Sequence, residues 1–274
     1  MPKIGIMQGR IIPEDIKQLQ VFPISNWRNE LRIIKDIGFK YVEFLYDKKL
    51  VLKKLLDEDL FIKESYFFKS SEIPHANSMC LDFFASFSLL NEFAGFEAII
   101  FDLVKKIFSS GIKQLVIPFF DQNIIVLSSE LEKFCNLVTR SDIYKLLEDN
   151  KIFFVIETIL PAKDILKAME RFRKSRLGVC YDLGNAAAMG FVPEDEILEL
   201  GNLIRHVHIK DREKGGPNVL LGEGSVDFFK GFQSLKKIDY NGLVILETAY
   251  FEKPIDEAKR NLGFITEIIR ELNG

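Results

Sequence analysis

Eight short apolar segments alternate with longer amphipathic segments along the whole chain. Several of the short segments, such as F-F-V-I at 153–156, are apolar on both faces, as strands buried in a parallel sheet must be. The longer segments repeat apolar residues at helical spacing, as at Leu31 and Ile34 or at Leu262 and Ile265. The expected strands are residues 4–10, 40–47, 76–84, 113–119, 152–158, 177–182, 204–210 and 243–248.

This alternation predicts an α/β fold, a single (β/α)8 barrel of the TIM type that occupies residues 1–274 as one domain. The length suits such a barrel, and no composition break divides the chain. The expected helices include residues 48–69, residues 91–110, and residues 128–150 in two pieces about Ser141. An open doubly wound sheet uses the same alternation, but it usually carries a glycine-rich phosphate turn after its first strand. Because Gly5 and Gly9 lack that pattern, the barrel is favoured.

The amino-acid composition limits the kinds of partner that the protein is expected to bind. The chain is 47% hydrophobic, and its 37 basic and 40 acidic residues leave a net charge of −3. This balance gives no electrostatic reason to expect nucleic acid or an anionic membrane, and no apolar run approaches the roughly 20 residues of a membrane span. Cys80, Cys135 and Cys180 lack metal-type spacing, which predicts reduced thiols in a cytoplasmic protein. The sequence leaves a homo-oligomer open.

Four consecutive predicted strands each end in a side chain that can bind a metal ion. These are Glu157 in F-V-I-E-T, Asp182 in Y-D-L-G-N, His208 in V-H-I-K-D and Glu247 in L-E-T. The carboxyl ends of barrel strands meet at one mouth, where the active sites of such barrels lie. We therefore expect these four side chains to be neighbours around one side of the mouth.

Three carboxylates and one imidazole favour one divalent ion, Mn²⁺, Mg²⁺ or Co²⁺ rather than Zn²⁺. Without an ion, three ionised carboxylates repel each other, so we expect the pKa of at least one to be raised. Each residue also has a simpler interpretation: Asp182, for example, starts a sequence that is good turn chemistry. His206 shares the strand parity of His208 and is interpreted as a hydrogen-bonded structural residue one layer deeper, and His75 as a surface or supporting residue.

These motifs resemble the xylose-isomerase-like barrel superfamily of sugar and sugar-phosphate isomerases and epimerases. The resemblance runs along nearly the whole chain, through M-Q-G-R at 7–10, G-F-K-Y-V-E-F at 38–44, S-M-C-L-D-F-F at 78–84 and the four strand ends. L-G-E-G-S-V-D-F at 221–228 is similar to a segment of L-ribulose-5-phosphate and hexulose-6-phosphate 3-epimerases.

The resemblance implies that Glu157, Asp182, His208 and Glu247 bind the ion, and that Glu157 and Glu247 are also the catalytic acid–base pair. The ion would bind the carbonyl and a neighbouring hydroxyl of a ketose and stabilise an enediolate. One glutamate would take the proton from carbon and the other would return one on the opposite face. The implied activity is epimerisation, at carbon 3, of a ketose or ketose phosphate.

Further candidates lie around the mouth. Lys210 and Arg212 follow His208 and are expected either to meet a negative oxygen of the substrate or to be rim cations. Glu43 and Asp82 are expected to contact substrate hydroxyls or to be rim charges. A phosphate is left open: the glycine-rich segment 213–225 could supply backbone donors, but Glu223 puts negative charge there.

Other functions are compatible with the same strand ends. An aldose–ketose isomerase or an inosose-type dehydratase would use the same metal site. Apurinic endonucleases share this barrel, but they need a histidine-rich cluster of zinc ions, and this chain has only three histidines. A non-catalytic barrel that only binds a sugar is disfavoured because Glu157 and Glu247 are both present.

Overall fold

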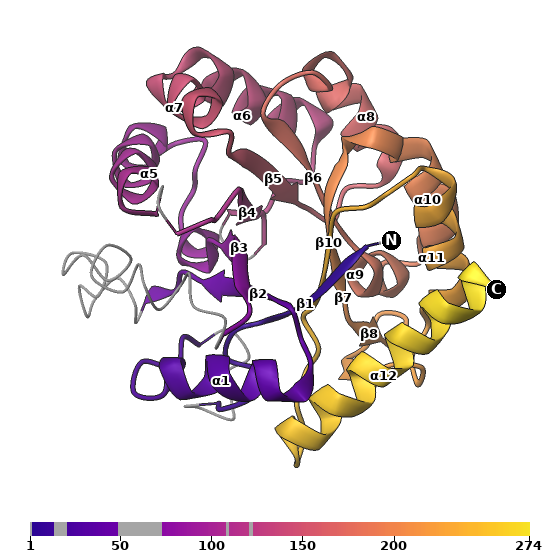
Figure 1. The fold of residues 1–274 in the computed structure, drawn as a ribbon. Coiled ribbons are helices and arrows are strands. Elements are labelled where there is room, and N and C mark those ends of the chain that lie inside the picture. The colour runs from indigo at the N-terminus through magenta and orange to yellow at the C-terminus, as the bar shows by residue number, and fades with distance from the viewer. Residues whose placement is uncertain (1, 14–20, 49–72, 108–109, 121–122) are drawn as a thin grey trace.

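The structure is a computed structural model that describes residues 2–13, 21–48, 73–107, 110–120 and 123–274. Eight parallel strands close into a barrel in the order β1-β10-β7-β6-β5-β4-β3-β2, with helices arranged around it (Figure 1). The predicted TIM barrel is confirmed. The barrel strands are β1 (Lys3–Met7), β2 (Tyr41–Leu45), β3 (His75–Cys80), β4 (Gln114–Pro118), β5 (Phe153–Glu157), β6 (Leu177–Asp182), β7 (Ile204–Ile209) and β10 (Leu243–Leu246).

The helices of the described residues follow the strands in the alternating order expected from the sequence. They are α1 (Trp27–Ile37), α5 (Phe93–Ile107), α6 (Ser128–Arg140), α7 (Asp142–Asn150), α8 (Ala162–Met169), α9 (Leu183–Ala188), α10 (Pro193–Leu200), α11 (Phe228–Lys237) and α12 (Pro254–Asn273). The predicted break at Ser141 separates α6 from α7. The helix predicted over 48–69 falls almost entirely outside the described residues. None of the described helices is both long and apolar enough to cross a membrane.

Two hydrophobic cores hold the barrel together. The larger lies between strands and helices and includes Ile6, Phe44 and Phe154, all less than 1% exposed. The smaller fills the barrel interior, with members such as Met7, Val155 and Ile245. Burying such side chains stabilises the fold by about 1.5–3 kcal/mol each. Polar side chains that point into the barrel are removed from water, so they need hydrogen-bond or ionic partners there.

One buried carboxylate fixes the loop that follows β1. Glu30 on α1 is fully buried, and its side chain accepts hydrogen bonds from the backbone N–H groups of Gly9, Ile11 and Ile12 at 3.0–3.2 Å. Burial raises the pKa of Glu30 to about 7, although these hydrogen bonds lower it. Gly9 itself has φ +85°, and a Cβ there would lie 2.5 Å from the carbonyl oxygen of Val21. The loop conformation thus depends on both residues.

Replacing Glu30 with alanine should lower the free energy of unfolding by about 2–4 kcal/mol, because buried N–H groups lose their acceptor. Urea denaturation followed by circular dichroism measures this loss. Asp36→Ala, at an exposed position of the same helix, is the matched control and should change the value by less than about 0.5 kcal/mol. Equal stability of the two variants would contradict the prediction.

Candidate metal centre

The four predicted ligands come together at the carboxyl end of the barrel. Glu157 and Asp182 are the last residues of β5 and β6, His208 is near the end of β7, and Glu247 follows β10 directly. One ligand atom from each lies within 4.8 Å of the others, and all four side chains are buried. Their use as metal ligands stays a prediction, but their grouping is a feature of the structure.

Strand pairing explains why they meet. Strands β5, β6, β7 and β10 are consecutive in the barrel. Asp182 pairs with His208 across β6 and β7, and His208 pairs with Ile245, two residues before Glu247. Because side chains alternate between the two faces of a strand, residues two apart point into the barrel together. Four inward side chains thus surround one point at the mouth.

The spacing suits a small divalent ion. Ligand atoms about 2.1 Å from an ion lie about 3 Å apart when adjacent and about 4.2 Å apart when opposite. His208 Nδ1 lies 3.1 Å from Glu247 Oε2 and 3.5 Å from Glu157 Oε2. This buried nitrogen makes no well-directed hydrogen bond in the described residues. A ring nitrogen held among carboxylate oxygens without a hydrogen bond is what a metal ligand requires, so the residues fit the ion.

Neighbouring carboxylates contribute to a raised pKa at Asp182, as predicted. Burial raises the pKa of Asp182 to about 7; Lys210 opposes this, while Glu157 and Glu247 add to it. For Glu247 burial acts in the same direction, but Lys210, His208 and Arg10 outweigh it and hold the pKa well below its usual value. Arg10, which is 3% exposed, has Nη2 3.7 Å from Glu247 Oε1. The charges around the centre are therefore closely balanced.

Lys210 lies inside this group rather than at its rim. Its Nζ is 2.7 Å from Asp182 Oδ2 and 3.1 Å from Glu247 Oε2. These two carboxylates raise the pKa of Lys210 although burial lowers it. The lysine is thus a permanent positive charge among the predicted ligands.

Asn185 links Arg212 to the centre, and the sequence did not single it out. Its Nδ2 donates to Glu157 Oε1 and to Asp182 Oδ2, both at 3.2 Å, and its Oδ1 accepts from Arg212 Nη1 at 3.1 Å. Asp182 also caps α9, because its Oδ1 accepts from the backbone N–H of Asn185. The turn interpretation of Asp182 was therefore correct in part, and the carboxylate still faces the centre. The spacing Asp182–Asn185 in D-L-G-N was the available signal.

The structure places Glu43 and Asp82 in different environments. Glu43 is fully buried below the mouth, with Oε1 2.8 Å from His208 Nε2 and Oε2 2.8 Å from His206 Nε2. The expectation of a rim charge was wrong for Glu43, because its carboxylate is fully buried between two histidines. They lower its pKa to about 2 against the effect of burial. Asp82 is half-buried at the start of the 3-10 helix Asp82–Ser86, just beyond β3, and its contact with substrate stays a prediction.

The glycine-rich segment is organised by a carboxylate of the chain itself. Asp211 is 1% exposed and accepts hydrogen bonds from the backbone N–H groups of Gly222 and Gly224 at 2.9 Å and of Val226 at 3.2 Å. A Cβ at Gly224 would lie 2.2 Å from Asp211 Oδ1. The remaining N–H groups of the segment's candidate donors, those of Gly215, Gly216 and Ser225, bond to carbonyl groups. All the backbone donors considered for a phosphate are thus already used.

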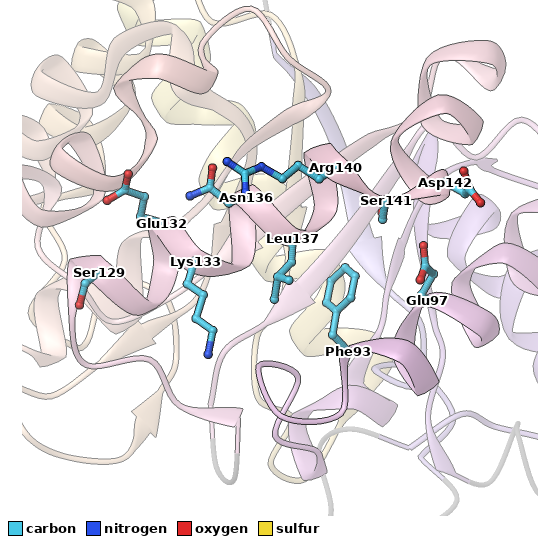
Figure 2. Close-up of a pocket in the computed structure, with 10 residues that line it drawn as sticks. All are labelled: Phe93, Glu97, Ser129, Glu132, Lys133, Asn136, Leu137, Arg140, Ser141 and Asp142. Atoms are coloured by element: carbon cyan, nitrogen blue, oxygen red, sulfur yellow. The ribbon is translucent and has the colours of Figure 1, made fainter.

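A cavity of about 800 Å³ lies away from this centre, on the outside of the barrel. Its lining residues come mainly from α5 and α6, with Phe93, Glu97 and Arg140 among them (Figure 2). It contains none of the predicted site residues. Its size alone therefore does not make it the functional site.

Comparison with known proteins agrees with the barrel fold. Residues 139–268 match the family model of the xylose isomerase-like TIM barrel, so the resemblance seen in the sequence is confirmed. The inosose dehydratase of Geobacillus kaustophilus is 27% identical over 139 residues, which are 43% of this chain and 44% of that protein. The matched segment spans half the length or less of the curated relatives.

Solved structures share the fold over nearly the whole chain. The D-psicose 3-epimerase of Clostridium cellulolyticum H10, solved with D-tagatose, has a TM-score of 0.72 and 14% identity and covers 97% of this chain and 99% of its own. The IOLI protein, solved with a zinc atom, has a TM-score of 0.72 and 14% identity, with 98% and 97% covered. At this identity the likeness establishes the barrel and nothing finer.

Proposed function

We propose that this protein is a divalent-metal-dependent epimerase that inverts carbon 3 of a ketose. Its residues 139–268 match the xylose isomerase-like TIM barrel family. The observation that carries the proposal is the grouping of Glu157, Asp182, His208 and Glu247 within 4.8 Å at the barrel mouth. The sugar 3-epimerases among the structural neighbours support the same class of reaction.

A bound Mn²⁺, Mg²⁺ or Co²⁺ supplies a Lewis acid that withdraws negative charge from the oxygens of the substrate. Asp182 and His208 would hold the ion from adjacent strands. Glu157 and Glu247 reach the centre from β5 and from the end of β10, with β6 and β7 between them, so they flank a sugar from two sides. Each turns Oε2 toward His208 Nδ1. Each therefore keeps a second oxygen for a proton.

The two second oxygens have different neighbours. Glu157 Oε1 accepts a hydrogen bond from Asn185, whereas Glu247 Oε1 faces Arg10. One carboxylate removes the proton from carbon 3 and becomes protonated, and the other, protonated beforehand, delivers its proton to the opposite face. The carbon keeps the same substituents and only its configuration changes. Exchange of protons with water then returns both glutamates to their starting protonation states for the next turnover.

We also propose that the substrate carries no phosphate. The region after strands seven and eight of such barrels is a frequent phosphate site. Here Asp211 occupies the backbone donors of Gly222 and Gly224, and a second anion beside it would be repelled. Lys210 and Arg212 are similarly engaged with Asp182 and Asn185. Among the residues that the structure describes, these features favour a free ketose.

The test is to incubate the metal-loaded protein with a panel of free ketoses and their terminal phosphates in D₂O and to follow the products by NMR. We expect deuterium at carbon 3 together with the epimer, and at least a tenfold higher kcat/KM for a free ketose than for its phosphate. An aldose or a dehydrated ketone would instead identify an isomerase or a dehydratase, the latter favoured by the relative that is an inosose dehydratase. A preference for the phosphate would contradict only the second proposal.

A further inference from the structure

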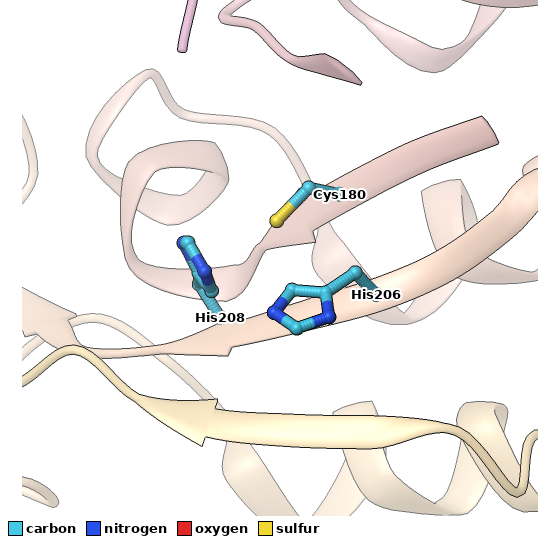
Figure 3. Close-up of side chains that lie close together, drawn as sticks. All are labelled: Cys180, His206 and His208. Carbon is cyan, nitrogen blue, oxygen red and sulfur yellow. The ribbon is translucent and has the colours of Figure 1, made fainter. Parts of the chain in front are cut away.

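A column of polar side chains runs through the barrel interior beneath the metal centre. Glu43 on β2 lies between two histidine rings of β7, with one carboxylate oxygen 2.8 Å from Nε2 of each. The rings of His206 and His208 are 5.1 Å apart and nearly perpendicular (Figure 3). All three side chains are fully buried. Three polar side chains in the barrel interior replace apolar packing, and they are stable there only when they are paired with one another.

The column continues to the amino-terminal end of the barrel. His206 Nδ1 lies 2.6 Å from Oε1 of Gln114, the first residue of β4. The amide of Gln114 cannot turn freely, because its Nε2 donates to the carbonyl oxygen of Arg205 at 2.7 Å. Gln114 therefore fixes His206 with Nδ1 as the hydrogen-bond donor, and Nε2 of His206 lies 2.8 Å from one oxygen of Glu43 without a well-directed hydrogen bond. The other oxygen of Glu43 is left facing His208.

This arrangement determines which nitrogen of His208 can bind a metal ion. A carboxylate only accepts hydrogen bonds, so the nitrogen that faces Glu43, Nε2, must carry a hydrogen. In the neutral ring that a metal ion requires, the lone pair is then on Nδ1, which points at Glu157 and Glu247. A histidine ligand whose second nitrogen donates to a carboxylate is held in one tautomer and one orientation.

We propose that Glu43 is the positioning residue of the metal centre: it fixes His208 with Nε2 protonated and Nδ1 directed at the ion. The proposal rests on the metal site of the proposed function. Glu43 acts through His208 and does not touch the substrate. Glu43 accepts the hydrogen bond of His208 Nε2, and a charged carboxylate is a stronger acceptor for it than a neutral amide.

The same residues invite another interpretation, which the geometry disfavours. Ligand atoms of Cys180, His206 and His208 lie within 4.8 Å of one another and could form a second metal site (Figure 3). However, both nitrogens of His208 are engaged, Nε2 by the hydrogen bond to Glu43 at 2.8 Å and Nδ1 at the predicted metal centre, so the ring has none left for a second ion. We therefore expect one ion per chain.

The experiment compares the wild type, Glu43→Gln and Cys180→Ala. Dialysed protein is titrated with Co²⁺ and with Mn²⁺ by calorimetry, and circular dichroism checks that each variant is folded. Glu43→Gln should weaken both affinities about 10–100-fold, because a neutral amide is a weaker hydrogen-bond acceptor for His208 Nε2 than a carboxylate. Cys180→Ala is the matched control from the same interior layer, and its affinities should stay within about threefold of the wild type.

A spectroscopic measurement tests the same point without a variant. In ¹⁵N-histidine spectra of the Mg²⁺-loaded wild type, His208 should show a protonated Nε2 and an unprotonated Nδ1. The reverse assignment would overturn the proposal, as would unchanged affinity in a folded Glu43→Gln protein or a second ion that Cys180→Ala removes. A wild type that binds no dication would overturn the metal site and this proposal together. Normal ion binding with weakening in Glu43→Gln, but no epimerase activity, would overturn only the proposed function.

Discussion

Replacing Glu247 with glutamine should reduce turnover of the best ketose by about 10²–10⁴-fold, the usual contribution of a general acid or base. Glutamine keeps the size of the side chain and one oxygen for the ion, but it cannot exchange a proton. Steady-state kinetics with the metal-loaded variant measures the loss. Glu252→Gln, the same change at an exposed position five residues further on, is the control and should leave kcat unchanged.

Solvent exchange makes this prediction more specific. If two carboxylates act on opposite faces, Glu247→Gln retains Glu157, which still removes the proton from one of the two epimers. That epimer should exchange its carbon-3 proton with D₂O without inversion, while the other epimer should not exchange. Near-normal epimerisation, or equal exchange from both epimers, would contradict the two-base mechanism.

Removing the metal ion should abolish turnover and lower the thermal stability. With the ion at about 100 times its Kd, binding to the folded state contributes about 2.7 kcal/mol, which for a chain of this size is a shift in Tm of about 5–10 °C. Activity assays and differential scanning fluorimetry before and after chelation measure both effects. Adding Mn²⁺, Co²⁺ or Mg²⁺ should restore them.

Asp182→Asn provides the control for the metal experiment. The variant loses one charged ligand and should show a much smaller metal-dependent shift in Tm, although asparagine still caps α9. Full turnover in wild-type protein that elemental analysis shows to be free of metal would contradict a metal-dependent reaction.

The sequence was most informative where the fold depends on local patterns. Strand β6 has the predicted limits, because the apolar run of 177–181 is followed by Asp182 and a helix start. The four strand ends could be placed together because parallel strands of a barrel all end at one mouth. Helix α9 was missed, because D-L-G-N is also good turn chemistry and the helix spans only Leu183–Ala188.

Features that depend on distant parts of the chain could not be predicted. Glu43 was expected near the rim, but its depth follows from how far β2 is shifted along its neighbours, which no local pattern encodes. The partners of Asp211 and Glu30 are backbone N–H groups 11–15 and 18–21 residues away. Such contacts are identified only once the loops are in place.

The position of Lys210 has a consequence for the barrel mouth when no ion is bound. Its ammonium group neutralises part of the acidic mouth by contacting Asp182 and Glu247. The ammonium group thus limits the electrostatic repulsion among these carboxylates when no ion is bound. An ion bound as proposed would have to compete with the lysine for the same carboxylate oxygens.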